Sequence, residues 1–205
     1  NGFFIPFCAF SEAKGMCIKM KKTIEPISLI YPLPVVLVTA SDKQGNNNII
    51  TVAWTTNLCR KPVCLGIAIG KGKFSENLLR DTMEFVVNIP EKKNLREIDL
   101  CGSTHGNVIN KFEATKFTPV DATIVKPKLI KECPINIECK IIGISELDSS
   151  NFFIGEVLKV HIDENILKEE RQIDFKKLDP VLYAQEKYYS FGKFLKVRGF
   201  SKKLN

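Results

Sequence analysis

The stretch Asn48–Ser75 limits the fold of this chain more than any other part of its sequence. Two runs within it, 49–56 and 63–70, are rich in Val, Ile and Thr, which suit the pleated and half-buried surface of a β-strand. A short polar turn at 60–62 joins the two runs. Together they predict an antiparallel hairpin, and therefore a sheet, at the centre of the fold.

A glycine-bearing, cationic turn, Gly70–Ser75, follows the hairpin directly. It ends a strand and starts a predicted helix with Ser75 as N-cap, so its free backbone N–H groups, the helix dipole and the lysine side chains suit an anion. The hairpin also contains the only Trp of the chain, Trp54, followed by Thr55 and Thr56. These features predict a site for a flat aromatic ligand that carries a phosphate group.

Other motifs point to simpler explanations. The glycine spacing in the turn fits neither a P-loop nor a dinucleotide fingerprint, so a tight turn before a helix remains an equal alternative to an anion site. His105 and His161 are the only histidines, too few for a His-rich metal site, and no metal is predicted. The seven cysteines form no C-x-x-C pair, which indicates reduced thiols in a cytoplasmic protein.

Short strands and brief helices alternate along the rest of the chain. Strands are predicted at 35–41, 84–90, 135–147 and 152–162, and short helices at 94–101 and 107–114. About six strands at short intervals, without helices of crossover length, favour a mainly β fold, a closed or split antiparallel barrel, over a parallel sheet. Within 135–147, isoleucines alternate with Asn136, Glu138 and Lys140, which predicts one buried and one solvated face.

The chain length of 205 residues suits one domain. We expect a single domain at 20–205 and an N-terminal extension at 1–19 that is not part of the core. No apolar run is long enough to span a bilayer, so no membrane association is predicted. An aromatic tail at 183–200 leaves more apolar surface than one short-stranded barrel covers, which predicts a homodimer.

The net charge of +7 raises the question of nucleic acid as a partner. The lysines are spread along nearly every segment and form only small clusters, as on ordinary solvated faces. A basic barrel that binds single-stranded nucleic acid would also need exposed aromatic residues interleaved with the lysines, and the predicted strands do not show them. Nucleic-acid binding is therefore kept only as a remote alternative.

Several segments share a pattern that no single motif carries. They are YPLPVVLVTASD (31–42), NNIITVAWT (47–55), FSENLLRDTMEFVVNIP (74–90), CG…NKF (101–112), ECPINIEC (132–139), FFIGEVLKVHID (152–163) and LYAQEKYYSFGKFLKVRGFS (182–201). Their number and order over about residues 20–205 resemble the flavin reductase-like family of FMN-binding split barrels, and most closely its flavoredoxin branch. The resemblance implies a six-stranded Greek-key split barrel whose homodimer binds FMN at the subunit interface.

The resemblance also implies which residues hold the cofactor, while the chemistry belongs to the flavin and no catalytic side chain is expected. The positions that match the segment lining the flavin ring are Asn48, Ala53, Trp54, Thr55 and Thr56. Lys71, Phe74 and Ser75 match the turn that holds the ribityl phosphate, Lys111 matches a lysine near the flavin, and Tyr183 matches an aromatic residue that closes the pocket.

Two positions depart from the family pattern. Relatives commonly have a histidine where the substrate approaches the flavin, and this chain has Ser150. Relatives often have Ser-Gly before the Lys-Phe pair, and this chain has His105-Gly106, which brings a histidine towards the flavin or its phosphate. The first departure weakens the case for NAD(P)H as an efficient electron donor.

The function expected from the resemblance is that of an FMN-binding oxidoreductase, which reduces bound or free flavin with NAD(P)H or passes electrons to a redox protein partner. The alternative is a non-catalytic FMN electron carrier of flavoredoxin type, which needs no nicotinamide pocket. The sequence does not distinguish NADH from NADPH and names no physiological donor or acceptor.

Overall fold

The computed structural model describes residues 21–169 and 172–202. The predicted extension at 1–19 lies outside the described residues. In the part of the chain that is described, no helix has the length and apolar character needed to cross a membrane.

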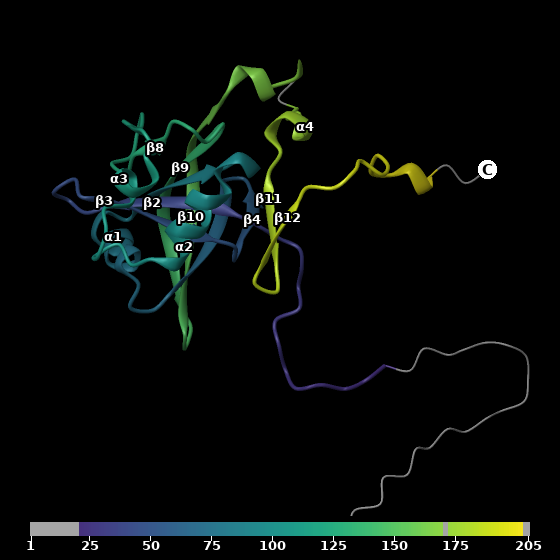
Figure 1. Ribbon diagram of the computed structural model, residues 1–205, viewed down its shortest axis with the longest axis horizontal. Coiled ribbons are helices and arrows are strands. Elements are labelled where there is room, and N and C mark those ends of the chain that lie inside the picture. The colour runs from purple at the N-terminus through teal and green to yellow at the C-terminus, as the bar shows by residue number, and fades with distance from the viewer. Residues whose placement is uncertain (1–20, 170–171, 203–205) are drawn as a thin grey trace, which may run out of the picture.

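One antiparallel sheet of seven strands forms the body of the molecule (Figure 1). Its strand order is β3-β2-β6-β9-β10-β5-β4. The strands are β2 (Val36–Ser41), β3 (Asn47–Val52), β4 (Thr55–Arg60), β5 (Val63–Gly70), β6 (Glu84–Ile89), β9 (Ile135–Glu146) and β10 (Ser150–Ile162). β3 and β4 follow each other in the chain but lie at opposite ends of this order, so the sheet curves until its two edges meet. The predicted mainly β, split-barrel fold is confirmed.

The predicted strand at 49–56 is wrong as a single element, because the chain leaves one edge of the sheet and joins the other within it. β3 ends at Val52 and pairs with β2, whereas β4 starts at Thr55 and pairs with β5. Ala53 and Trp54 connect the two edges. The predicted hairpin is therefore β4–β5, and the main sheet has seven strands instead of the expected six.

Short helices fill the connections between the strands. They are α1 (Phe74–Thr82), α2 (Leu95–Ser103), α3 (Lys111–Thr115) and α4 (Phe175–Leu178), with short 3₁₀ turns at η1 (Lys92–Asn94), η2 (Glu164–Ile166) and η4 (Phe200–Lys202). The prediction that Ser75 is the N-cap of α1 is wrong, because the helix starts one residue before it, at Phe74, and the cap position is Lys73. The helix predicted at 107–114 shortens to α3, because the side chain of Asn110 accepts hydrogen bonds from the N–H groups of Phe112 and Glu113 and caps the helix there.

The core has two main parts. The barrel interior contains the side chains that alternate on the inner face of the sheet, among them Val38, Leu65, Ile67, Phe85 and Phe153. A second cluster packs α2 and neighbouring loops against β2 and β3, and its members include Leu37, Ile49, Ile98, Cys101 and Ile130. α2 is held in this way beside β3, which positions its polar face near the point where the sheet edges meet.

The predicted solvated face of β9 is wrong for two of its three polar residues. Asn136 and Glu138 are buried and only Lys140 is exposed. The segment 121–130, most of which lies outside helices and strands, covers this face, and Glu138 accepts hydrogen bonds from the N–H groups of Thr123 and Ile124. The alternation of apolar and polar residues therefore marks two buried faces here, one apolar and one hydrogen-bonded.

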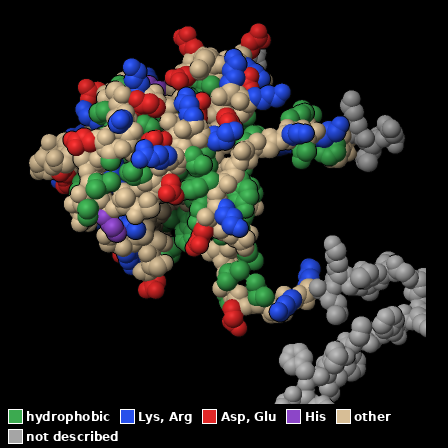
Figure 2. All heavy atoms as spheres, in the orientation of Figure 1, with side chains coloured by type: hydrophobic (Ala, Val, Ile, Leu, Met, Phe, Trp, Pro, Cys, Tyr) green, Lys and Arg blue, Asp and Glu red, His purple; other side chains and the backbone are tan. Residues whose placement is uncertain are grey.

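A small second sheet extends beside the barrel. It consists of β1 (Leu33–Pro34), β11 (Val181–Ala184) and β12 (Lys187–Ser190), and a further pair joins β7 (Pro119–Val120) to β8 (Leu129–Ile130). The segments 21–32 and 191–202 leave this region as arms that project away from the barrel (Figure 1). Figure 2 shows hydrophobic side chains on both arms and on the face between the barrel and the β11–β12 hairpin.

Candidate functional site

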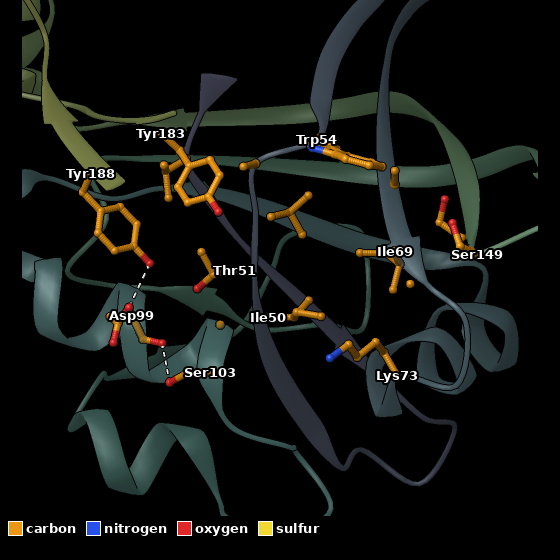
Figure 3. A pocket seen from close by; sticks show the side chains of 17 residues that line it. Ile50, Thr51, Trp54, Ile69, Lys73, Asp99, Ser103, Ser149, Tyr183 and Tyr188 are labelled. Carbon is orange, nitrogen blue, oxygen red and sulfur yellow. Dashed lines mark hydrogen bonds between the residues drawn. The ribbon is translucent and has the colours of Figure 1, made fainter. Parts of the chain in front are cut away.

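A cavity of about 560 Å³ lies where the two edges of the sheet meet (Figure 3). Of the predicted site residues, it is lined by Ala53, Trp54, Ser150 and Tyr183. Its volume lies within the range of about 300–1,000 Å³ that is usual for small-molecule sites. Lys73 of the predicted anion-binding turn also lines it, and the lining residues outside the predicted site include Thr51, Asp99, Ser103 and Tyr188.

Aromatic and apolar side chains form most of the wall. Trp54 is 53% exposed, which shows that this residue faces the opening and is not part of the core. Tyr183 and Tyr188 pack edge to face, with 5.9 Å between their ring centroids. Figure 3 shows both tyrosines on one side of the cavity, with Ile50 and Lys73 on another side. The Lys73 side chain points inwards, so a cation lies at one end of a space lined by both apolar and polar side chains.

The other end of the cavity carries a hydrogen-bonded group from α2. Tyr188 donates a hydrogen bond to a carboxylate oxygen of Asp99 (3.1 Å), and the Ser103 hydroxyl donates to the backbone carbonyl of Asp99 (2.8 Å). Burial and the hydrogen bond to Asp99 together raise the pKa of Tyr188 to about 12. Tyr188 is thus a neutral hydrogen-bond donor at physiological pH. Asp99 and Ser103 lie on one face of α2 at i, i+4 spacing. This spacing was the signal in the sequence that could have identified them as a pair of polar residues on the same side of a helix.

A second, much smaller cavity of about 10 Å³ brings together five predicted residues. They are Asn48, Phe74, Ser75, His105 and Lys111. The Asn48 side chain donates to the Ser75 hydroxyl (2.8 Å), and both residues are buried. Gly106 permits this packing, because an added Cβ would lie 2.3 Å from Oδ1 of Asn48. Lys73 lines this cavity as well as the large one and links the two.

Lys111 is a buried cation with spare donors. Its side chain is 3% exposed, and Nζ donates to the carbonyl of Cys101 at 2.7 Å. Burial lowers the pKa of Lys111, and the positive charge of Lys73 lowers it further. An ammonium group has three N–H donors, and within the described residues Nζ has this one hydrogen bond. An anion beside Lys111 and Lys73 would offset the cost of burying the charge.

The Gly70–Ser75 turn does not offer free N–H groups at all the positions predicted. Lys71 N–H donates to the Ser149 carbonyl (3.1 Å), and Gly72 N–H donates to a carboxylate oxygen of Glu76 (2.9 Å). The lysine that lines the cavities is Lys73, whereas Lys71 is exposed and lines neither. The expectation that Lys71 holds the phosphate stays a prediction.

An apolar cavity of about 500 Å³ lies on the other side of Trp54. It contains the remaining predicted residues, Thr55 and Thr56, and is completed by the N-terminal arm at 27–33. Trp54 and Ser150 line both this cavity and the large one. Every predicted site residue except Lys71 therefore lies in one of three cavities grouped around the meeting edges of the sheet.

Comparison with known proteins places the chain in a family. Residues 28–192 match the family model for the flavin reductase like domain. A protein of Archaeoglobus fulgidus described only as uncharacterised is 31% identical over 139 residues, which cover 68% of this chain and 77% of that protein.

Two solved structures are similar over nearly the whole chain. The flavoredoxin of Desulfovibrio vulgaris (Miyazaki F) has a TM-score of 0.84 and 31% identity, covering 90% of this chain and 100% of that one. The flavoredoxin from Methanosarcina acetivorans has a TM-score of 0.83 and 27% identity, covering 90% of this chain and 98% of that one. This protein therefore belongs to the flavin reductase-like family of flavin-binding oxidoreductases and electron carriers.

Proposed function

We propose that this protein binds FMN in the cavity between the sheet edges and acts as an oxidoreductase or electron carrier. The observation that carries this proposal is that Lys73 lines both a large cavity, whose walls include Trp54, Tyr183 and apolar side chains, and the small neighbouring cavity that Lys111 lines. A phosphate and a flat aromatic ring need these two environments side by side.

The residues present fit the phosphate end of FMN. Lys111 is buried with donors to spare, and the N–H groups of Phe74 and Ser75 lie at the start of α1, where an anion is favoured by the helix dipole. The large cavity is open and apolar enough for a ring system, and Trp54 supplies one wall. When bound, FMN would supply the capacity to accept and release electrons.

The chain's own side chains would bind and orient this group. Lys73 and Lys111 would offset the charge of the phosphate, and Tyr183 would cover the ring from the β11–β12 side. Tyr188, kept protonated by its environment, would donate a hydrogen bond at the far end of the cavity. Trp54 separates the ring site from the apolar cavity, which leaves that cavity as the route for a second molecule or chain.

The first expected result is that the purified protein binds FMN in preference to FAD. The chain has no dinucleotide fingerprint, and the cation end of the site is small. Extraction followed by mass measurement identifies the bound flavin, and titration of flavin-free protein with FMN and FAD compares their affinities. No extracted flavin, together with no change in absorbance or melting temperature on adding FMN, would contradict the proposal.

The second expected result concerns the electron donor. Hydride transfer needs the nicotinamide held close over the flavin, and Ser150 offers neither the reach nor the charge of the histidine common in relatives. Ser150 is 8% exposed and lines both the large cavity and the apolar cavity. We expect slow bleaching of bound FMN by NADH and NADPH in anaerobic stopped-flow measurements, and faster bleaching by dithionite.

The comparison variant is Ser150→His. If Ser150 limits the approach of the nicotinamide, this variant should bleach faster with NADH or NADPH and at the parent rate with dithionite. Fast, saturable reduction of the parent by a nicotinamide would instead identify an ordinary reductase.

The third expected result is a homodimer. The arms at 21–32 and 191–202 expose large apolar side chains that the barrel does not cover, including Ile30 (89%), Phe194 (75%) and Leu195 (84%). Such surfaces are covered by a partner in stable proteins, and the arm at 27–33 also lines the apolar cavity beside Trp54. Light scattering at micromolar concentration should give twice the mass of one chain. Deletion of 191–205 should shift the mass towards the monomer, and a parent that is already a stable monomer would contradict this proposal.

A further inference from the structure

The β4–β5 hairpin places two cysteines opposite each other at the edge of the main sheet. Cys59 of β4 and Cys64 of β5 are direct partners in the antiparallel register. Such partners have Cα atoms about 4.5–5.5 Å apart, and disulfides form across Cα separations of about 4.4–6.8 Å. The side chains of a directly opposed pair also project from the same face of the sheet. The backbone therefore meets the main geometric conditions for a disulfide.

A bulge in β4 creates this pairing. Asn57 pairs with Leu65, so an unbroken ladder would place Leu58 opposite Cys64. The register shifts by one residue after Asn57, which brings Cys59 opposite Cys64 instead. Bulges re-aim side chains and are frequent at sheet edges and beside functional sites. The bulge in β4 therefore places the two thiols opposite each other.

The two thiols differ in access to solvent. Cys59 is exposed, and its thiol donates to the Lys61 carbonyl (3.4 Å). Cys64 is 4% exposed and alternates with Leu65 and Ile67, which face the barrel core, so it lies on the outer face of the sheet. Burial raises the pKa of the Cys64 thiol, and Cys59 and Glu156 raise it further. Cys59 is thus the thiol that meets a reagent first, and Cys64 is the second, protected thiol.

The other cysteines of the described residues cannot replace either partner. Cys139 lies on β9, and β10 separates β9 from β5. Strands two positions apart lie about 9–10 Å from each other, beyond the reach of a disulfide. Cys101 and Cys133 are buried in a different cluster, between α2 and the sheet.

We propose that Cys59 and Cys64 form a dithiol site that exchanges with small-molecule disulfides and closes to an intrachain disulfide across the hairpin. The Cys59 thiolate attacks one sulfur of the disulfide, forms a mixed disulfide and releases a thiolate, which takes up the proton that Cys59 lost. Cys64 then gives up its proton and attacks the Cys59 sulfur, which releases the second thiol. Two cysteine thiols are oxidised by two electrons in total, and one disulfide is reduced to two thiols.

The experiment uses the full chain with oxidised glutathione as the probe. After reaction, remaining thiols are alkylated under denaturing conditions and the protein is cut with trypsin. Trypsin cuts after Arg60, between the two cysteines, and gives the peptides 44–60 and 61–71. We expect these peptides to be joined in the oxidised parent and to separate on reduction, with no alkyl group on either cysteine.

Three variants test the order of events. Cys64→Ser should lose the joined peptides completely and retain glutathione on Cys59, because no second thiol displaces it. Cys59→Ser should lose both the joined peptides and the bound glutathione, because Cys64 is protected. Cys133→Ala, which removes a buried thiol from a different cluster, should form the joined peptides like the parent.

Other outcomes would overturn the proposal. One is a parent protein in which glutathione stays on Cys59, as is expected only for the Cys64→Ser variant. Another is a linkage of Cys59 to Cys8, to Cys17 or to Cys59 of a second chain in place of Cys64. Circular dichroism of the parent and of each variant checks that the fold is retained, so that the absence of joined peptides cannot be attributed to unfolding.

Discussion

Replacing Glu138 with glutamine should lower the free energy of unfolding by about 3 kcal/mol, because a fully buried carboxylate loses a set of charge-assisted hydrogen bonds. Glu138 is 0% exposed and accepts from the N–H groups of Thr123, Ile124 and Val125. His161 lies 2.6 Å from the same carboxylate. An amide has one acceptor oxygen and would turn its N–H groups towards these donors.

The same carboxylate predicts a loss of stability in acid. Burial alone would raise the pKa of Glu138, but the hydrogen bonds from His161 and from three backbone N–H groups lower it to about 2. In the unfolded chain a Glu has a pKa of about 4.3. The contribution of this group is therefore fully present above about pH 4.3 and is lost as the pH falls through the folded value.

Denaturant unfolding of the parent and of Glu138→Gln between pH 7 and pH 3 measures both effects. The difference between the two proteins should shrink as the pH falls. The matched control is Glu146→Gln on the same strand, whose carboxylate forms an exposed ion pair with Arg80 and should change stability by less than about 1 kcal/mol. Equal effects of the two substitutions would show that the hydrogen bonds to segment 121–130 contribute no more than a surface ion pair.

Replacing Lys111 with methionine should weaken FMN binding by about tenfold to a hundredfold, since a charged hydrogen bond to a phosphate contributes about 1.5–3 kcal/mol. Methionine retains an unbranched side chain, one heavy atom shorter than that of lysine, and removes the charge. Because the buried ammonium is costly without an anion, the flavin-free variant should be at least as stable as the parent. A purely structural lysine would give the opposite result, a less stable flavin-free protein with unchanged affinity.

The two lysines of the turn provide the matched comparison. Lys73 lines the cavities and Lys71 does not. Lys73→Met should therefore weaken binding and reduce its dependence on salt concentration, and Lys71→Met should change the affinity much less. Titrations with FMN at two ionic strengths measure both quantities. A larger effect at Lys71 would support the assignment from family resemblance over the one from geometry.

The strands that the sequence predicts correctly are those whose pattern is local. β5, β6, β9 and β10 are found within a few residues of their expected positions, because they are rich in β-branched residues and are bounded by polar, glycine-bearing or proline-bearing turns. The division of the first run at Ala53 and Trp54 was not predictable in this way, because neither residue is a turn signal. That break depends on closure of the sheet, which is a property of the whole chain.

The candidate site was predictable in its general place but not in its details. Resemblance and the Gly70–Ser75 turn pointed to some of the residues that line the three cavities, but not to Thr51, Asp99, Ser103 or Tyr188. The burial of Glu138 depends on residues 123–125, which lie 13 to 15 residues earlier in the chain and belong to no helix or strand. The same holds for Tyr188, whose partner Asp99 is 89 residues earlier in the chain. Contacts of this kind leave no periodic signal in a single sequence.

The meeting of β3 and β4 has a consequence for how chains with this fold can change over time. These two strands are the ends of the sheet order, and in the described residues they are not paired with each other. The side chains around this gap line the cavities, whereas the hydrogen bonds of the sheet are made by backbone atoms, which most side-chain substitutions leave in place. Substitutions at the gap can alter the size and polarity of the ligand site without removing a hydrogen bond of the ladder. Substitutions that change the ligand preference at this gap should therefore have small effects on the stability of the sheet, so we expect the gap to vary more among related chains than the paired strands do.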